Sequence, residues 1–253
     1  MTKSYRQLHA AYRVVSDVLS TGPDPVLSKQ VLLNRLVDRL ACFRGVCTVY
    51  SDFTAEGRTR LIDVAFVGAA DALPFERGRN GPECVNPRIN PLTDRCARHG
   101  ANLAVLHRRT LMSDADWERS GIGPGVRAAG LGELMCAWYR RSDGSAFTLG
   151  LFKSIGGGAF TLGDFRLVRM VLKELRRLSE SGRFLDRPAG IDPPGLTVRE
   201  KQVLALLLKG CSGKEVASHL GISCLTVAGY VKDLYRQFEV HSRSELLAKF
   251  IRR

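Results

Sequence analysis

The side chains best suited to chemistry lie in the last quarter of the chain, where basic and hydroxyl groups recur beside predicted helix starts. Lys232 and Arg236 are four residues apart, so on a helix they share one face and can reach a phosphate or the edge of a guanine. Lys214 and Thr226 stand near two predicted helix starts, where backbone amides favour anions. This pattern indicates contact with nucleic acid; an ordinary solvated helix face is the alternative.

Signals for helix boundaries are dense in the same region. Capping boxes begin three helices, glycines end two, and one serine caps the start of another. The residues concerned are Thr197 with Glu200, Ser212 with Glu215, Ser242 with Glu245, Gly210, Gly221 and Ser223. They predict helices over 197–209, 213–220, 224–238 and 242–251.

The middle pair of predicted helices has the spacing of a helix-turn-helix. Ala217 is small where two helices cross, Gly221 permits the turn, and Val227 packs back against the first helix. This motif presents its second helix to the major groove while helix N-termini rest on phosphates. The residues predicted to face DNA are Lys214, Ser223, Thr226, Ala228, Gly229, Lys232, Asp233 and Arg236.

Residues 196–251 resemble the C-terminal DNA-binding domain of LuxR-type (GerE-type) bacterial transcriptional regulators. The resemblance implies a four-helix domain that binds DNA as a dimer, with the last helix of each subunit in the dimer contact. The segments that carry it are Leu196-Thr197-x-Arg199-Glu200, Gly210-x-Ser212-x-Lys214-Glu215-Val216-Ala217, Leu220-x-Ile222-Ser223-x-x-Thr226-Val227 and Val240-x-Ser242-Arg243-x-Glu245-Leu246.

The sequence departs from the family pattern on the helix that would enter the groove. Ala228 stands where the family usually has lysine, Tyr230 where it has histidine, and Gln237-Phe238 where it has Lys-Leu. The loss of a lysine removes one usual DNA contact. These departures support an alternative in which DNA binding is weak or nonspecific.

The first 179 residues predict an α+β domain with helices at both ends of an antiparallel sheet. Strands are expected at 46–50 and 61–67, and a hairpin joins 133–141 to 146–153 through the turn Ser142-Asp143-Gly144-Ser145, because glycine accepts the positive φ of such turns. The order of elements resembles GAF-like sensory domains. Residues 180–195 are rich in Pro and Gly and predict a linker, so the DNA-binding domain spans 196–253.

A small-molecule pocket in the first domain would need apolar walls and a few polar groups. The candidates for its lining are Trp117, Trp138, Tyr139, Phe147 and Phe160; the alternative is that these aromatic residues form an ordinary core. No two acidic residues are adjacent, which disfavours a phosphoacceptor receiver domain. The pattern of acyl-homoserine-lactone pockets is not matched either.

Cysteine and histidine spacing supports neither a metal site nor an enzyme. Cys42-x4-Cys47 and Cys96-x2-His99 lack the two tight pairs typical of zinc. A Cys-His hydrolase would use Cys96 or Cys136 with His99 or His107, but no residue pattern marks an oxyanion hole. We therefore predict no catalytic residues, no metal and no cofactor, with the cysteines reduced.

The two helices that bound the first domain each repeat apolar residues at steps of three and four. Either each helix packs on its own sheet, or the stripes form a dimer seam that signals to the linker. The repeats are Tyr5, Leu8, Tyr12, Val15 and Leu19, and then Phe165, Val168, Leu172 and Leu175.

Composition limits the function classes that remain. The 253 residues are 45% hydrophobic and 25% charged, which excludes a disordered or fibrous chain; without a span or signal peptide, a cytoplasmic protein is expected. The formal charge of +13 favours a polyanionic partner, with net +5 in residues 196–253 and +8 before them.

The prediction is a regulator that binds promoter DNA as a homodimer under control of its first domain. Its partners would be double-stranded DNA, RNA polymerase or a regulatory protein, and a small-molecule effector, but no membrane. The alternative is a ligand-free interaction or oligomerisation module.

Overall fold

The computed structural model describes residues 3–22, 24–54, 59–68, 90–180, 196–208 and 210–251. The chain divides into two compact units, Met1–Asp186 and Arg187–Arg253. The predicted linker at 180–195 lies, apart from Glu180, outside the described residues. No helix in the described ranges has the length and apolar character needed to cross a membrane.

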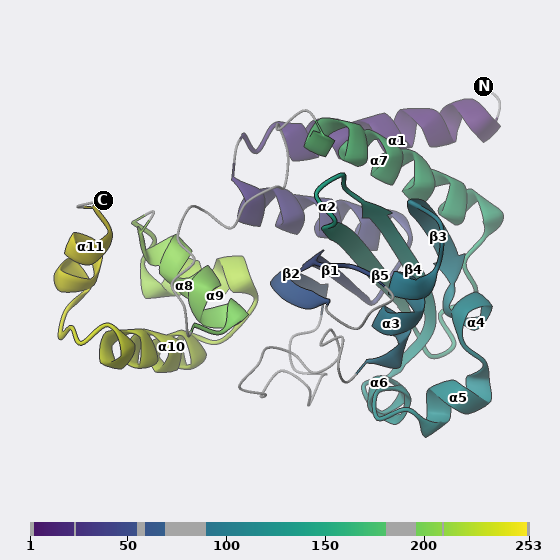
Figure 1. Ribbon diagram of the computed structural model, residues 1–253. Helices are drawn as coiled ribbons and strands as arrows, with labels where there is room; N and C mark the ends of the chain where they lie inside the picture. Colours follow the sequence, from purple (N-terminus) through teal and green to yellow (C-terminus); the bar gives the residue numbers. More distant parts are fainter. Residues whose placement is uncertain are drawn as a thin grey trace. The chain divides into compact units, whose positions relative to one another are not determined.

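The first unit is built on an antiparallel sheet of five strands in the order β2-β1-β5-β4-β3 (Figure 1). The predicted hairpin is confirmed: β4 and β5 pair, Gly144 has φ +81°, and the side chain of Asp143 accepts from the amide of Ser145 at 2.9 Å. The strands are β1 (Arg44–Ser51), β2 (Arg60–Gly68), β3 (Leu103–His107), β4 (Leu131–Arg140) and β5 (Ala146–Ser154).

Three long helices cover one face of this sheet. They are α1 (Lys3–Leu19), α2 (Pro25–Arg39) and α7 (Leu162–Glu180), and Figure 1 shows α1 and α7 side by side. Asp24 caps α2, and Pro25 at its start needs no amide partner. Val18, Leu36 and Leu172 are fully buried in the resulting core. The prediction of an α+β domain with terminal helices is confirmed.

Shorter helices cover the other face of the sheet and one of its ends. They surround a second core that contains Trp117 and Trp138. Three of these four helices have six residues or fewer, which is too short for a clear apolar period in the sequence. The helices are α3 (Pro91–Arg98), α4 (Arg108–Leu111), α5 (Asp114–Arg119) and α6 (Gly123–Ala128).

The apolar residues that repeat at steps of three and four along α1 mostly point to the surface and not into the core. Tyr12 is 61% exposed and Tyr5 is 54% exposed, and Leu8 and Leu19 are also on the surface; of the stripe, only Val15 is buried. Smaller residues of the adjacent helix face, Ala10, Ala11, Val14 and Val18, fill the core instead. On α7, by contrast, Val168, Leu172 and Leu175 are buried and Phe165 is partly buried, so that stripe packs on its own unit.

The second unit contains four helices within its described residues, as predicted. They are α8 (Val198–Leu208), α9 (Gly213–Leu220), α10 (Cys224–Gln237) and α11 (Arg243–Ile251). Val203, Val216, Leu234 and Leu246 are completely buried and form the interior. The capping box of Ser212 and Glu215 is present. At α11 the box differs, because the carboxylate of Glu245 accepts from the amide of His241 and not of Ser242.

Candidate nucleic-acid interface and interior cavity

Helices α9 and α10 form the predicted helix-turn-helix. Gly221 ends α9 in the left-handed conformation, with φ +62°. The hydroxyl of Ser223 then accepts from the amide of Thr226 at 3.0 Å and starts α10. Ala217 and Val227 are buried where the two helices pack. The turn therefore fixes the direction in which α10 leaves the motif.

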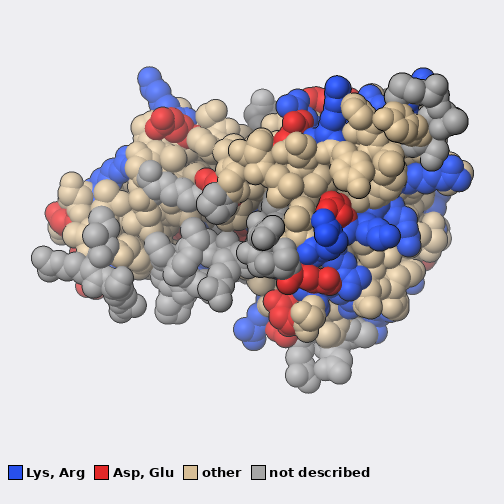
Figure 2. All heavy atoms as spheres, turned by 90° about the horizontal axis from the view of Figure 1, so that it is seen from above, with Lys and Arg blue, Asp and Glu red and all other residues tan. Residues whose placement is uncertain are grey.

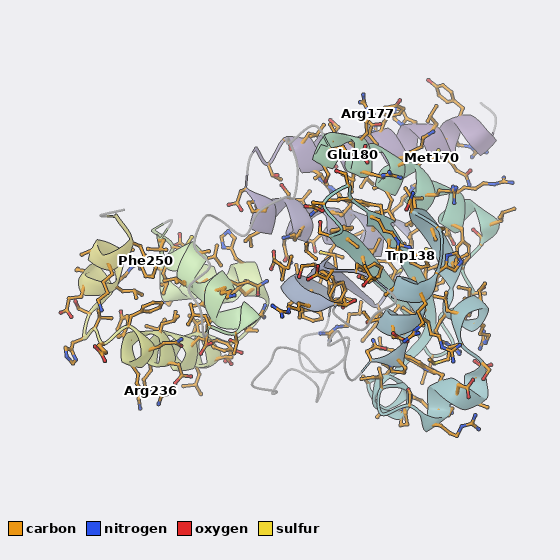
Figure 3. All side chains as sticks on the ribbon, in the orientation of Figure 1. Trp138, Met170, Arg177, Glu180, Arg236 and Phe250 are labelled. Carbon is orange, nitrogen blue, oxygen red and sulfur yellow. The ribbon has the colours of Figure 1, made fainter. Side chains whose placement is uncertain are left out.

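The outer face of α10 carries the residues predicted to contact DNA. Ala228, Gly229 and Lys232 are exposed, and Leu225 on the same helix is 84% exposed. Arg236 points away from the rest of its unit (Figure 3) and donates to Asp233 at 2.7 Å. This ion pair spans three residues of an exposed helix, so it contributes little to stability and leaves the guanidinium free to exchange Asp233 for a phosphate.

The other two predicted contacts near helix starts are also exposed. Lys214 occupies the first turn of α9 and Thr226 the first turn of α10, where unpaired amides create a positive end. The hydroxyl of Thr226 already lies 2.8 Å from that of Ser223. Lys214 and Lys232 have no ion-pair partner within the described chain, so both ammonium groups face solvent.

Several cations of the second unit serve its interior instead. Arg199 is 9% exposed and donates to the carbonyl of Leu220 at 2.8 Å, which ties α8 to the end of α9. Arg243 donates to the carbonyl of Leu207 at 3.0 Å and ties α11 to α8. Lys249 donates to the carbonyl of Phe238. The net charge of this unit therefore overstates the number of cations available to a polyanion.

In the first unit a cavity lies between α3 and one face of the sheet. The cavity has a volume of about 80 Å³ and is partly open to solvent. Its floor comes from β1, β4 and β5 through residues such as Thr48, Cys136 and Thr148, and its roof from α3 through Leu92 and Cys96. The walls contain no charged side chain among the described residues. Such a cavity can hold a small uncharged group that has few polar atoms.

The polar groups of the cavity are neutral donors and acceptors. The hydroxyls of Thr48 and Thr148 are hydrogen-bonded to each other across β1 and β5. Asn90 caps α3 by accepting from the amide of Leu92 at 2.9 Å, and Thr93 lies on the same helix at the cavity wall. These groups can orient a ligand without a net charge.

None of the five aromatic residues predicted to contact a ligand lines this cavity. Tyr139 and Phe147 stack at 5.3 Å beneath the opposite face of the sheet, and Phe160 lies in the same core. Trp138 is completely buried (labelled in Figure 3) and donates to the carbonyl of Ala101 at 3.1 Å. Trp117 packs under the guanidinium of Arg108. The structure thus places all five in the cores.

The sequence carries one signal for the lining of this cavity, which a search for aromatic residues does not find. In β5 the large residues Phe147, Leu149 and Leu151 alternate with Thr148, Gly150 and Phe152. The second set faces α3 and includes a glycine and a threonine, which leave room beside a polar group. Strand alternation fixes the set, but only the position of α3 shows that a cavity lies there.

The histidines of the hydrolase alternative have other partners. The ring of His107 contacts Glu133 and accepts from the amide of Arg109 at 3.1 Å. His99 accepts from the amide of Ala101 at 3.2 Å. Burial raises the pKa of Glu133, but the hydrogen bonds from His107 and Arg109 outweigh it and leave this pKa below its usual range. No group of three or more metal-binding side chains is gathered within the described ranges.

Two solved structures of the regulator SdiA are similar to this chain. The crystal structure of Escherichia coli SdiA shares 15% identity with a TM-score of 0.40, over 88% of this chain and 87% of that one. SdiA in complex with octanoyl-rac-glycerol shares 16% identity with a TM-score of 0.39, over 97% of this chain and 91% of that one. No curated protein matches the sequence.

The family described as bacterial regulatory proteins, luxR family, matches residues 194–250. This match covers α8, α9, α10 and all but the last residue of α11, and therefore the complete helix-turn-helix. The resemblance predicted for residues 196–251 is confirmed.

Proposed function

We propose, from the membership of residues 194–250 in the luxR family of bacterial regulatory proteins, that the chain is a cytoplasmic transcription regulator and not an enzyme. The observation that carries this proposal is the helix-turn-helix, in which α10 presents an exposed face with Lys232 and Arg236. An α-helix of this kind fits the major groove, and two copies would read half-sites about one helical turn apart.

Promoter footprinting with the full chain tests this proposal. Two protected half-sites separated by about 10 base pairs are expected. Uniform protection that disappears at modest salt would instead show nonspecific binding through phosphates, and would favour the interaction-module alternative suggested by Ala228 and Tyr230. The footprint should be repeated across a salt series, because affinity without a stated salt concentration does not distinguish the two.

We further propose that the first unit binds a neutral amphiphile in the cavity between α3 and the sheet. The support is the lining: apolar residues, the Thr48–Thr148 pair, and no charged side chain among its described residues. An ion would lose its hydration there without gaining a partner. The effector would favour the arrangement in which two DNA-binding units reach their half-sites. RNA polymerase or another regulatory protein would respond to that complex.

Thermal shifts test the cavity with a matched pair of probes. Octanoyl-rac-glycerol, the compound named in one of the SdiA structures, is neutral, while octanoate has the same chain and a charge. Only the glyceride is expected to raise the Tm of the first unit, by an amount that grows with its concentration. Thr148→Phe fills the cavity and should abolish the shift, whereas Thr148→Val should only reduce it. An equal response of wild type and Thr148→Phe would place the ligand elsewhere.

A further inference from the structure

The first turn of α10 carries a large apolar side chain that the protein itself does not cover. Leu225 is 84% exposed, more than any other large apolar residue in the described chain. Single exposed leucines are common on protein surfaces, but this one is the second residue of a helix that begins directly after the turn of the helix-turn-helix. The N-terminal residues of such a helix are the ones that contact base edges.

Leu225 lies on the same face of α10 as the two exposed cations. Residues three, four and seven positions apart share one side of an α-helix. This face therefore contains Leu225, Ala228, Gly229, Lys232 and Arg236, all of them exposed. The last two are cationic, whereas the first three have no hydrogen-bond donor or acceptor in their side chains. The side chains of this face in the first half of α10 can therefore read bases only through apolar contact.

The major groove of B-DNA offers one apolar group for such a contact. This group is the C5-methyl of thymine, which lies among the hydrogen-bond donors and acceptors of the base edges. A leucine that packs on this methyl group removes apolar surface from water. Against any other base edge, the same leucine would cover polar groups and leave them without partners. The start of α10 therefore suits a thymine.

Gly229 is the second unusual residue on this face. It lies inside α10, where glycine destabilises a helix relative to alanine. Its φ is not in the left-handed region, and a Cβ atom at this position would meet no other part of the described protein within 4 Å. Neither the backbone nor the packing of the described unit therefore requires a glycine here. Close approach of the backbone to a ligand is a further use of glycine, and the ligand on this face is DNA.

We propose that Leu225 selects a thymine in each half-site by packing on its C5-methyl group, and that Gly229 lets α10 approach the bases closely enough for this contact. This role rests on the proposed function and adds a base preference to promoter binding. Lys232 and Arg236 supply contacts to phosphate or guanine further along the same helix. Affinity then has a salt-dependent part from the cations and an apolar part from the leucine.

Deoxyuridine tests this contact, because it pairs with adenine as thymidine does and lacks only the methyl group. The probes are duplexes of the footprinted promoter site in which the thymines of the half-sites are replaced one at a time. Fluorescence anisotropy measures their affinity for the full chain. Replacing the contacted thymine should weaken binding about fourfold in one half-site and about fifteenfold in both. The same replacement between the half-sites should have no effect.

Leu225→Ala makes the matching change in the protein. The variant should bind the thymine duplex more weakly than wild type does and should lose most of the preference for thymine over uracil, which identifies the pair that interacts. Its Tm and its salt slope should be unchanged, because the side chain is exposed and uncharged. The control is Leu162→Ala, which removes a leucine that is 66% exposed in the first unit and should keep the full preference.

Gly229→Ala tests the close approach of the helix. The variant should have a higher Tm, since alanine favours the helix more than glycine does, and yet it should bind the thymine duplex more weakly. A higher Tm with unchanged affinity would show that Gly229 has no part in the contact.

Two results would overturn the role of Leu225. One is equal affinity of wild type for the thymine and uracil duplexes at a confined footprint. The other is a loss on uracil substitution that is as large in Leu225→Ala as in wild type, which would assign the methyl group to another residue. Both results leave promoter binding intact. Absence of any confined footprint would instead refute the proposed function, and this base preference with it.

Discussion

Single residues of the second unit divide into those that bind DNA in our proposal and those that hold its helices together. Lys232 and Arg236 are exposed on α10, whereas Arg199 and Arg243 are occupied by backbone carbonyls. Both groups are basic, so charge alone did not separate them. The separation comes from packing, because a guanidinium that ends near an open carbonyl at a helix terminus is stabilised there.

Replacing the exposed cations should weaken DNA binding without affecting the fold. Arg236→Ala is expected to cost about 1–3 kcal/mol of binding free energy if it reads a guanine. Lys232→Ala should weaken binding to all sequences and lower the salt slope by about 1. Fluorescence anisotropy over a salt series measures both, with an unchanged Tm for each variant.

The matched control for these variants is Arg243→Ala. It removes a cation of the same unit that donates to Leu207, and it should lower the Tm. Unchanged DNA affinity for both Lys232→Ala and Arg236→Ala would remove the outer face of α10 from the interface.

The position of α3 against the sheet depends on one arginine, Arg140. Arg140 donates to the carbonyls at the end of α3 and to that of Phe53, and its guanidinium lies 5.1 Å from the ring of Phe53. Burial lowers the pKa of Arg140, but the group remains charged at neutral pH because an arginine pKa lies so far above it. These contacts place α3, the roof of the cavity, against the sheet.

Arg140→Ala should therefore destabilise the first unit by about 1.5–3 kcal/mol, because several carbonyls lose a charged donor. Arg140→Lys should recover only part of this stability, since an ammonium group cannot span the same carbonyls. Urea denaturation measures both. Full recovery by lysine would show that charge, and not the geometry of the guanidinium, positions α3.

Two capping carboxylates, at the starts of α9 and α11, should make the stability of the second unit fall at acid pH. Hydrogen bonds from the amide and hydroxyl of Ser212 hold the pKa of Glu215 below its usual range. The amide of His241 and the hydroxyl of Ser242 lower the pKa of Glu245 in the same way. A depressed folded-state pKa contributes stability that is fully present above the unfolded value and is lost as pH falls through the folded value.

Glu215→Gln combined with Glu245→Gln should consequently flatten the loss of helix stability below about pH 4.5. Glutamine retains a cap acceptor without titrating. Thermal unfolding of the second unit, followed by circular dichroism as pH is lowered, measures the slope. If the Tm falls equally steeply with pH in the double variant and in wild type, Glu215 and Glu245 do not cause the loss of stability in acid.

The sequence predicted elements better than it predicted what they face. The period of α1 was correct, but Tyr5, Leu8, Tyr12 and Leu19 point outward, because the pattern identifies a stripe and not its partner. Small residues such as Ala10 and Ala11 let α1 approach α7 closely. A pattern based on large apolar residues does not include them. The second unit was predicted nearly complete because its caps are local signals, each satisfied within a few residues.

The outward-facing apolar residues of α1 support the hypothesis that a terminal helix forms a seam between two copies of the chain. Figure 2 views the face on which α1 and α7 lie and shows basic and acidic side chains among uncharged ones. Exposed aromatic and leucine residues along one helix are unusual on a surface that stays wet. We propose that two copies of the chain associate through this stripe.

Tyr5→Glu combined with Leu8→Glu should shift the chain from dimer to monomer. In a two-fold interface the new carboxylates of one subunit would lie near those of the other, and both their repulsion and their burial would cost free energy. Light scattering coupled to size-exclusion chromatography measures the mass. Ile155→Glu, which changes a residue that is 61% exposed outside α1, should leave the mass unchanged. A dimer that persists in the double variant would place the contact elsewhere, with α11 the next candidate.

The strand order of the first unit has a consequence for how the chain is made. β1 lies between β2 and β5, and its Thr48 meets Thr148 across 100 residues of sequence. During synthesis β1 can pair early only with β2, so its other edge stays open until β5 leaves the ribosome. An unpaired edge invites pairing with other chains, and such distant pairing is slow. A fragment that ends before β5 should therefore aggregate, whereas the helices of the second unit, with their local contacts, should fold quickly.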